Sequence, residues 1–110
     1  MKIDELAAAV GCEIVVSGDP MVEIIDGYTS DLLSDVMANA EEGSVFITIQ
    51  AHKNSVAVAS QLDFPAIIIC NGRSVPDDMR DAARAEGIAV LASKESQFEV
   101  SYRARKALKG

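Results

Sequence analysis

The sequence predicts an α/β fold, a single small domain with a mainly parallel sheet flanked by helices. From residue 22 onward, strand-like and helix-like segments alternate as β-α-β-α-β-α-β-α, after an N-terminal helix and strand. This order is typical of parallel strands joined by right-handed crossovers. Residues 65–70 form an almost continuous apolar run, which indicates a strand covered on both faces. The 110 residues fit one domain spanning residues 1–110.

The first three elements precede most of this alternation. A helix is expected over residues 3–10, because acidic residues suit its first turn and Gly11 suits its C-terminal end. Residues 12–16 are rich in β-branched side chains and predict a short strand. A Ser-Gly-Asp-Pro turn then leads into a second strand over residues 22–28.

Each later element is also predicted by its own pattern of apolar and capping residues. Ser30 is a plausible N-cap for the helix that follows the second strand, and Pro76 suits the first turn of a later helix. The expected elements are a helix over 31–40, a strand over 45–49, a helix over 54–62, a strand over 65–70, a helix from Pro76 to Gly87, a strand over 88–92 and a helix over 94–109.

The formal net charge is -7, from 17 acidic and 10 basic residues. An acidic surface repels nucleic-acid phosphates and anionic lipids, so we expect neither nucleic acid nor membrane as a partner. The cations crowd the C-terminal region, where they complement the dipole of a helix. The alternative is a small basic docking site. These cations are Arg103, Arg105, Lys106 and Lys109.

The two cysteines, Cys12 and Cys70, adjoin apolar runs and are interpreted as small buried hydrophobes. Residues 1–5 carry early acidic side chains instead of the pattern of a secretory signal. Together these features predict a reducing, cytoplasmic location.

Polar residues follow the ends of the predicted parallel strands. Ligands of open α/β sheets bind outside the carboxyl ends of the strands, and helix N-termini suit phosphate or carboxylate groups. These patterns predict an anionic small molecule as ligand, with a nucleotide as the first candidate. The alternative is that the loops are only solvated helix caps. The candidate ligand-binding residues are Tyr28, Thr29, Ser30, Asp31, Gln50, His52, Lys53, Asn54, Asn71, Gly72 and Arg73. A fourth strand end, residues 93–96, contributes nothing to this set.

No pattern in the sequence points to catalysis. The sole histidine, His52, has no cysteine or second histidine near it, and the serines near Ser30 do not form a nucleophile elbow. The phosphate-binding motifs G-x-x-x-x-G-K-[ST] and G-x-G-x-x-G are missing, as are metal-binding patterns. We therefore expect no cofactor, no catalytic residue and no metal ligand.

Four stretches carry a resemblance to the DRTGG domain family, namely residues 27–39, 43–48, 66–72 and 86–91. With a lead-in over residues 2–16, the resemblance covers nearly the whole chain. The chain is similar to stand-alone members, to the N-terminal domain of HPr kinase/phosphorylase and to the accessory domain of phosphotransacetylase. The resemblance implies a small α/β sandwich, often self-associated, with a regulatory or assembly role. The naming run Asp-Arg-Thr-Gly-Gly is replaced here by Asp-Gly-Tyr-Thr-Ser.

Residues and resemblance together predict a non-catalytic regulatory or ligand-sensing domain that acts as a homodimer or with a partner protein. The alternative is a structural interaction module without a ligand, using an apolar surface on the last helix or along an edge strand. A third reading, a small enzyme using His52 with Asp31 or Ser30, lacks an activated nucleophile.

Overall fold

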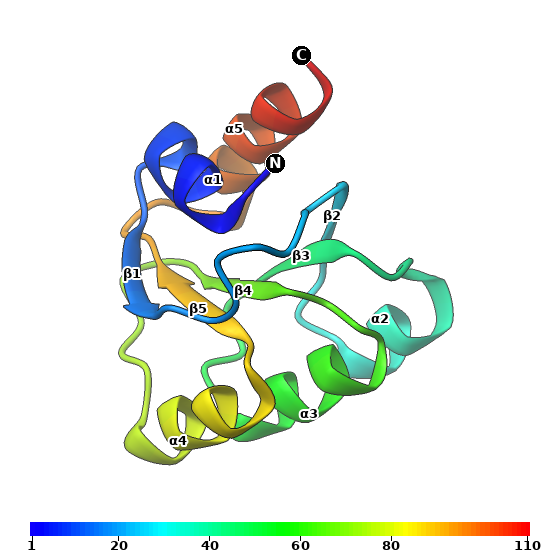
Figure 1. The fold of residues 1–110 in the computed structure, drawn as a ribbon, viewed down its shortest axis with the longest axis vertical. Helices are drawn as coiled ribbons and strands as arrows, with labels where there is room; N and C mark the ends of the chain where they lie inside the picture. Colours follow the sequence, from blue (N-terminus) through cyan, green and yellow to red (C-terminus); the bar gives the residue numbers. More distant parts are fainter.

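The computed structural model describes residues 1–110 and has three layers (Figure 1). Two helices cover one face of a five-stranded sheet and three cover the other. On the first face lie α1 (Ile3–Val10) and α5 (Gln97–Lys109). On the second face lie α2 (Leu33–Asn39), α3 (Lys53–Gln61) and α4 (Asp77–Glu86). No helix is long and apolar enough to cross a membrane.

The sheet has the order β1-β5-β4-β3-β2. Four neighbouring strands are parallel, and β1 pairs with β5 in the antiparallel direction. The predicted mainly parallel α/β fold is thereby confirmed. The strands are β1 (Glu13–Val16), β2 (Asp26–Thr29), β3 (Ser44–Thr48), β4 (Ala66–Ile69) and β5 (Ala89–Ala92).

The strand β4 is buried along its whole length and separates two apolar cores. Ile68 packs into the core beneath α1 and α5, whereas Ile67 and Ile69 pack into the core above α2, α3 and α4. Successive side chains of a strand point to opposite faces, so a strand covered on both faces must be apolar at every position. The interpretation of the apolar run at residues 65–70 is confirmed.

Two predicted helix starts are wrong for local reasons. The helix expected over 31–40 begins at Leu33, because the Ser30 hydroxyl accepts the Leu32 N–H and forms a turn before the helix. The helix expected over 94–109 begins at Gln97, because the Ser96 hydroxyl caps it by accepting the Glu99 N–H. The other helices begin and end within one or two residues of the prediction.

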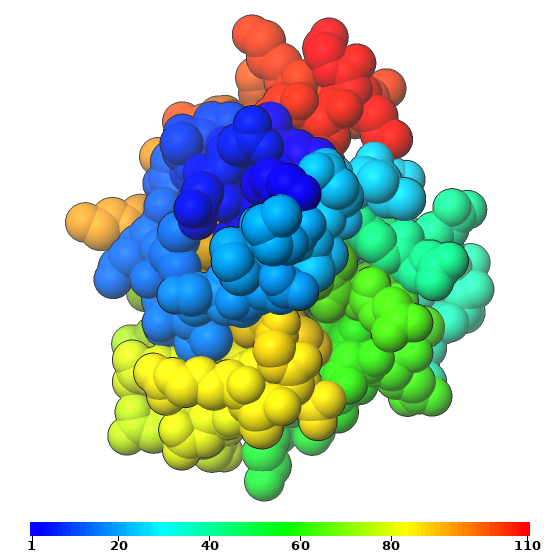
Figure 2. Space-filling view, viewed as in Figure 1, coloured from blue at the N-terminus to red at the C-terminus, as the bar shows by residue number.

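Residues 17–25 form a crossover from β1 at one edge of the sheet to β2 at the other (Figure 1). The strand predicted over 22–28 is therefore shorter, since the N–H groups of Ile24 and Ile25 bond Met1 O and Gly43 O. The crossover passes Ala89 and Gly43, which lie where parallel strands begin. Figure 2 shows it on the surface, filling the front of the molecule between the N-terminus and the end of α4.

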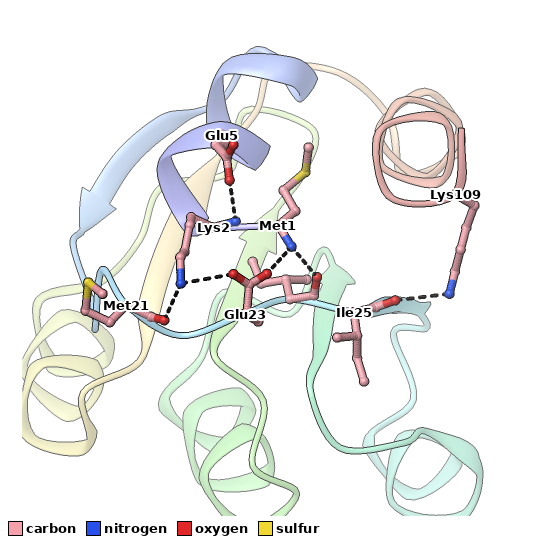
Figure 3. A network of polar contacts seen from close by, with 8 residues as sticks. Met1, Lys2, Glu5, Met21, Glu23, Ile25 and Lys109 are labelled. Atoms are coloured by element: carbon pink, nitrogen blue, oxygen red, sulfur yellow. Dashed lines mark hydrogen bonds and ion pairs between the residues drawn. The ribbon is translucent and has the colours of Figure 1, made fainter.

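Polar contacts hold the crossover to both helices of the first face (Figure 3). Lys2 donates from Nζ to Met21 O at 2.7 Å and pairs with Glu23 at 2.9 Å, while Lys109 Nζ donates to Ile25 O at 3.0 Å. Hydrogen bonds from the Met1 amino group and then from Lys2 lower the pKa of Glu23 to about 2. Because that pKa is depressed, the contacts of the Glu23 carboxylate stabilise the folded chain above pH 4.5, and this stabilisation is lost as the pH falls toward 2.

The close approach of Gly18 to β5 predicts a large loss of stability on substitution. A Cβ atom at Gly18 would lie 2.5 Å from Ala89 N, and φ is +66° there. We expect Gly18→Ala to lower the free energy of unfolding by about 3 kcal/mol, because a backbone clash adds to left-handed strain. Gly87→Ala is the matched control, since φ is +68° but no atom lies within 4 Å. It should cost about 1 kcal/mol. Equal losses for the two variants in urea unfolding would contradict the proposed clash.

Candidate anion-binding site

Tyr28 and Thr29, at the end of β2, point to opposite faces of the sheet. The Tyr28 hydroxyl donates to Asp35 Oδ2 of α2 at 2.9 Å, which raises the pKa of Tyr28 and lowers that of Asp35. The Thr29 hydroxyl lies 2.6 Å from the Ser101 hydroxyl of α5. Both side chains thus bond to helices, and one ligand on one face cannot reach both of them.

The loops after β2 and β3 contact each other through one side chain. Gln50 Nε2 donates to the main-chain oxygen of Asp31 at 2.8 Å, while the Asp31 carboxylate is exposed. Ser30 uses its hydroxyl in the turn before α2. The structure therefore brings Ser30, Asp31 and Gln50 together at the carboxyl end of the sheet, as expected for neighbouring parallel strands.

His52 is the N-cap of α3. Its Nδ1 accepts the Asn54 N–H at 3.0 Å, so the imidazole fills the position that Ser or Asp more often takes at a helix start. Lys53 and Asn54 follow as exposed residues of the first turn. This geometry agrees with the alternative interpretation of these loops, in which their polar residues only cap helices.

The loop after β4 is bonded to the loop after β5. Asn71 N donates to Glu95 O at 2.8 Å, and Gly72 N donates to Ser93 O at 2.9 Å. Both Asn71 and Gly72 have positive φ, which turns the chain sharply at the end of β4. Arg73 follows, exposed and without an ion pair.

A cavity of about 620 Å³ lies beside these joined loops. It is bounded by the turn between α1 and β1, by β1 itself and by the ends of β4 and β5, with Arg80 reaching in from α4 and Arg103 from α5. Its volume lies within the range of small-molecule sites. Of the eleven predicted site residues, Gly72 and Arg73 line it, and Thr29 lines a smaller cavity beneath α5. The others line none of the main cavities.

The topology explains why the cavity lies at this point. The chain leaves β4 toward α4 on one face and leaves the neighbouring β5 toward α5 on the other. Adjacent connections that diverge in this way open a crevice outside the carboxyl ends of the strands. After β2 and β3 the chain turns to the same face both times, so no such crevice opens there.

The cavity concentrates positive charge in an acidic chain. Its lining includes four of the ten cations, Arg73, Arg80, Lys94 and Arg103, and two of the 17 acidic residues, Glu13 and Glu95. Arg73 and Lys94 are exposed and make no ion pair. Guanidinium and ammonium groups gathered around a concave surface attract phosphate and carboxylate groups.

The other two cations are held by neighbouring residues. Arg80 Nη2 pairs with Asp77 at 2.7 Å. Arg103 Nε donates to Glu99 at 3.1 Å, and its Nη1 donates to Val10 O at 3.2 Å, the carbonyl at the end of α1. Each guanidinium has five N–H donors, so both keep free donors after these bonds are made.

The two thiols do not contribute a nucleophile. Cys12 and Cys70 are free, and burial raises the pKa of each to about 11, although Arg103 lowers that of Cys12 in part. A thiol with so high a pKa is almost wholly protonated at neutral pH, and the thiolate is the reactive form. The prediction that Cys70 is a buried hydrophobe is confirmed; Cys12 is half-buried.

Sequence reasoning missed most of the cavity's charged residues. The predicted site includes no residue of the strand end at 93–96 and therefore lacks Lys94, and the sequence interpretation places Arg103 among the cations that complement the dipole of the last helix. Lys94 has a signal in the sequence, since it is a cation that follows the last parallel strand by two residues. Arg80 and Arg103 have no such signal, because their approach depends on how α4 and α5 pack.

Comparison with known proteins places this arrangement in a family. The family model described as HPr Serine kinase N terminus matches residues 36–108, more than half of the chain. The chain belongs to this family. It is a DRTGG-type family, so the resemblance found in the sequence is confirmed. A comparison with curated proteins found no match.

One similar solved structure contains the CBS and DRTGG domains of the regulatory region of Clostridium perfringens pyrophosphatase, complexed with its activator diadenosine tetraphosphate. The TM-score is 0.73 at 14% sequence identity. The alignment covers 97% of this chain and 47% of that one, so this chain spans about half the length of its structural neighbour. At this identity the likeness shows the fold alone.

The cap formed by His52 predicts a stability effect without a binding effect. We expect His52→Ala to lower the free energy of unfolding by about 1 kcal/mol, because the Asn54 N–H loses its acceptor. His52→Asn, which keeps an acceptor at this position, should stay close to the wild type. Urea unfolding measures both. Unchanged stability in His52→Ala, together with weaker anion binding, would show that the imidazole serves a ligand instead.

Proposed function

We propose that this chain is a non-catalytic regulatory domain that binds an anionic small molecule in the cavity at the ends of β4 and β5. The observation that carries the proposal is the gathering of four of the ten cations around one cavity of ligand size in a chain of net charge -7. The ligand is a nucleotide or another phosphorylated small molecule. The chain acts as one DRTGG-like domain over residues 1–110, in the cytoplasm.

The family and the site both support a regulatory role. The structural neighbour is a regulatory region in complex with an activator that carries phosphate groups. In this chain, the sole imidazole and the two thiols are not available for catalysis, since His52 caps α3 and both thiols have a pKa of about 11. These observations support a site that binds a ligand without converting it.

Charge removal inside and outside the cavity tests the proposed site. With ADP as the probe, we expect the double variant Arg73→Gln and Lys94→Gln to weaken binding by about tenfold or more, because both unpaired cations are lost. Lys53→Gln is the control, since it removes one charge from the same edge of the sheet but outside the cavity. Isothermal titration calorimetry and thermal unfolding give the affinities.

Two outcomes would overturn this assignment. If ADP and inorganic phosphates leave the melting temperature unchanged at millimolar concentration, the cavity is not a ligand site. If Lys53→Gln abolishes binding and the double variant does not, the ligand binds at the loops that the sequence indicated.

The outer surface of α5 favours a second role, namely that of a homodimer interface. Phe98 and Tyr102 lie one turn apart and are 85% and 58% exposed. Beside Tyr102 lies a hollow that includes Ala8 and Ala107. Large exposed aromatic side chains mark interaction surfaces. This surface is formed by α1 and α5. Exposed acidic residues lie at the start of α1 and exposed cations late in α5, so a two-fold contact can pair the negative charges of one copy with the positive charges of the other.

The homodimer proposal predicts a change of oligomeric state. We expect the wild type to sediment as a dimer, and the double variant Phe98→Ser and Tyr102→Ser to sediment as a monomer with unchanged unfolding. Leu32→Ser is the control, because Leu32 is 60% exposed but precedes α2 on the other face. A monomeric wild type in analytical ultracentrifugation at tens of micromolar would rule the interface out.

A further inference from the structure

The lining of the cavity lacks the surface that a nucleobase needs. Only three of its 13 residues are hydrophobic, namely Val15, Val75 and Ala92, and none is aromatic. Bases are bound by stacking on aromatic side chains or by enclosure in apolar pockets. Recognition at this site must therefore depend on the anionic groups of the ligand.

The cations approach the cavity from both faces of the sheet. Arg80 comes from α4 and Arg103 from α5, and these helices lie on opposite faces (Figure 1). Arg73 and Lys94 belong to the two loops that diverge toward those helices. Space of about 620 Å³ is on the order of twenty water volumes, which is several times the volume of one phosphate group. A single phosphate placed against one face leaves the cations of the other face unused.

The mixture of held and free cations suits a ligand with several charges. Asp77 and Glu99 hold Arg80 and Arg103 in place at the two sides, whereas Arg73 and Lys94 are unpaired and free to close on a ligand. The lining holds four cations against two carboxylates, Glu13 and Glu95, and the carboxylates of Asp77 and Glu99 that pair with two of the cations lie outside it. A polyanion gains more from this field than a monoanion does.

We propose that the cavity binds a small molecule with at least two phosphate groups, one toward α4 and one toward α5, and recognises the phosphates without reading a base. This inference rests on the proposed function, because it takes the cavity as the ligand site. It narrows the ligand from a nucleotide or any phosphorylated molecule to the bis-phosphorylated and polyphosphorylated class.

A series of five probes at constant ionic strength tests the ligand class by calorimetry. Pyrophosphate should bind at least about tenfold more tightly than orthophosphate, because it reaches cations on both faces. ADP should bind within about threefold of pyrophosphate, AMP should bind as weakly as orthophosphate, and adenosine should not bind. Equal affinities for pyrophosphate and orthophosphate would overturn the inference, and so would AMP or adenosine binding as tightly as ADP.

These outcomes separate the inference from the proposed function. Tight AMP binding that is lost in the double variant of Arg73 and Lys94 would keep the cavity as the ligand site and reject the two-phosphate class. A lack of binding by all five probes would reject both.

Two arginines of α4 provide a matched pair of variants for the bridging geometry. Arg80 pairs with Asp77 and lines the cavity, whereas Arg84 pairs with Asp81 in the same i,i+3 manner and lies outside it. We expect Arg80→Gln to reduce the preference for pyrophosphate over orthophosphate by about fivefold or more, and Arg84→Gln to leave it unchanged. A preserved preference in Arg80→Gln, or an equal loss in both variants, would overturn the bridging geometry.

Discussion

Burial of β4 on both faces is the constraint on which the other features of this structure depend. Every residue of β4 is apolar and buried, so helices must cover the sheet above and below. Three consecutive β-α-β crossovers place α2, α3 and α4 on one face. The chain can cover the other face only by sending its two terminal helices there. The last connection therefore diverges from the one before it, and the crevice between β4 and β5 follows from that divergence.

Different segments of the chain lie at the amino ends and at the carboxyl ends of the parallel strands. The crossover of residues 17–25 lies along their amino ends and is held to α1 and α5 by Lys2 and Lys109. The carboxyl ends have no such cover, and there the chain presents loops and cations. The cationic cavity therefore lies at the end of the sheet opposite to the crossover, whose surface Figure 2 shows.

The charge distribution at the open end has a structural cost that the fold partly offsets. Four cations around one cavity repel one another, and acidic residues outside the lining, Asp77 and Glu99, each pair with one of them. These pairs are partly exposed and contribute little to stability. Their effect is positional, because they hold two guanidinium groups at opposite sides of the cavity. The bond from Arg103 to Val10 O also ties α5 to the end of α1, between residues 93 positions apart.

The sequence by itself determined the α/β class, the order of the elements and the family, since these follow from periodicity, from apolar runs and from local motifs. It also identified the carboxyl ends of the strands as the place where polar residues gather, and Gly72 and Arg73 as part of that set. Only the tertiary structure decided which strand ends share a cavity. That choice depends on the face to which each helix packs, a property of contacts distant in the sequence. For the same reason Lys94, Arg80 and Arg103 became neighbours, while His52, conspicuous in the sequence, became the cap of a helix.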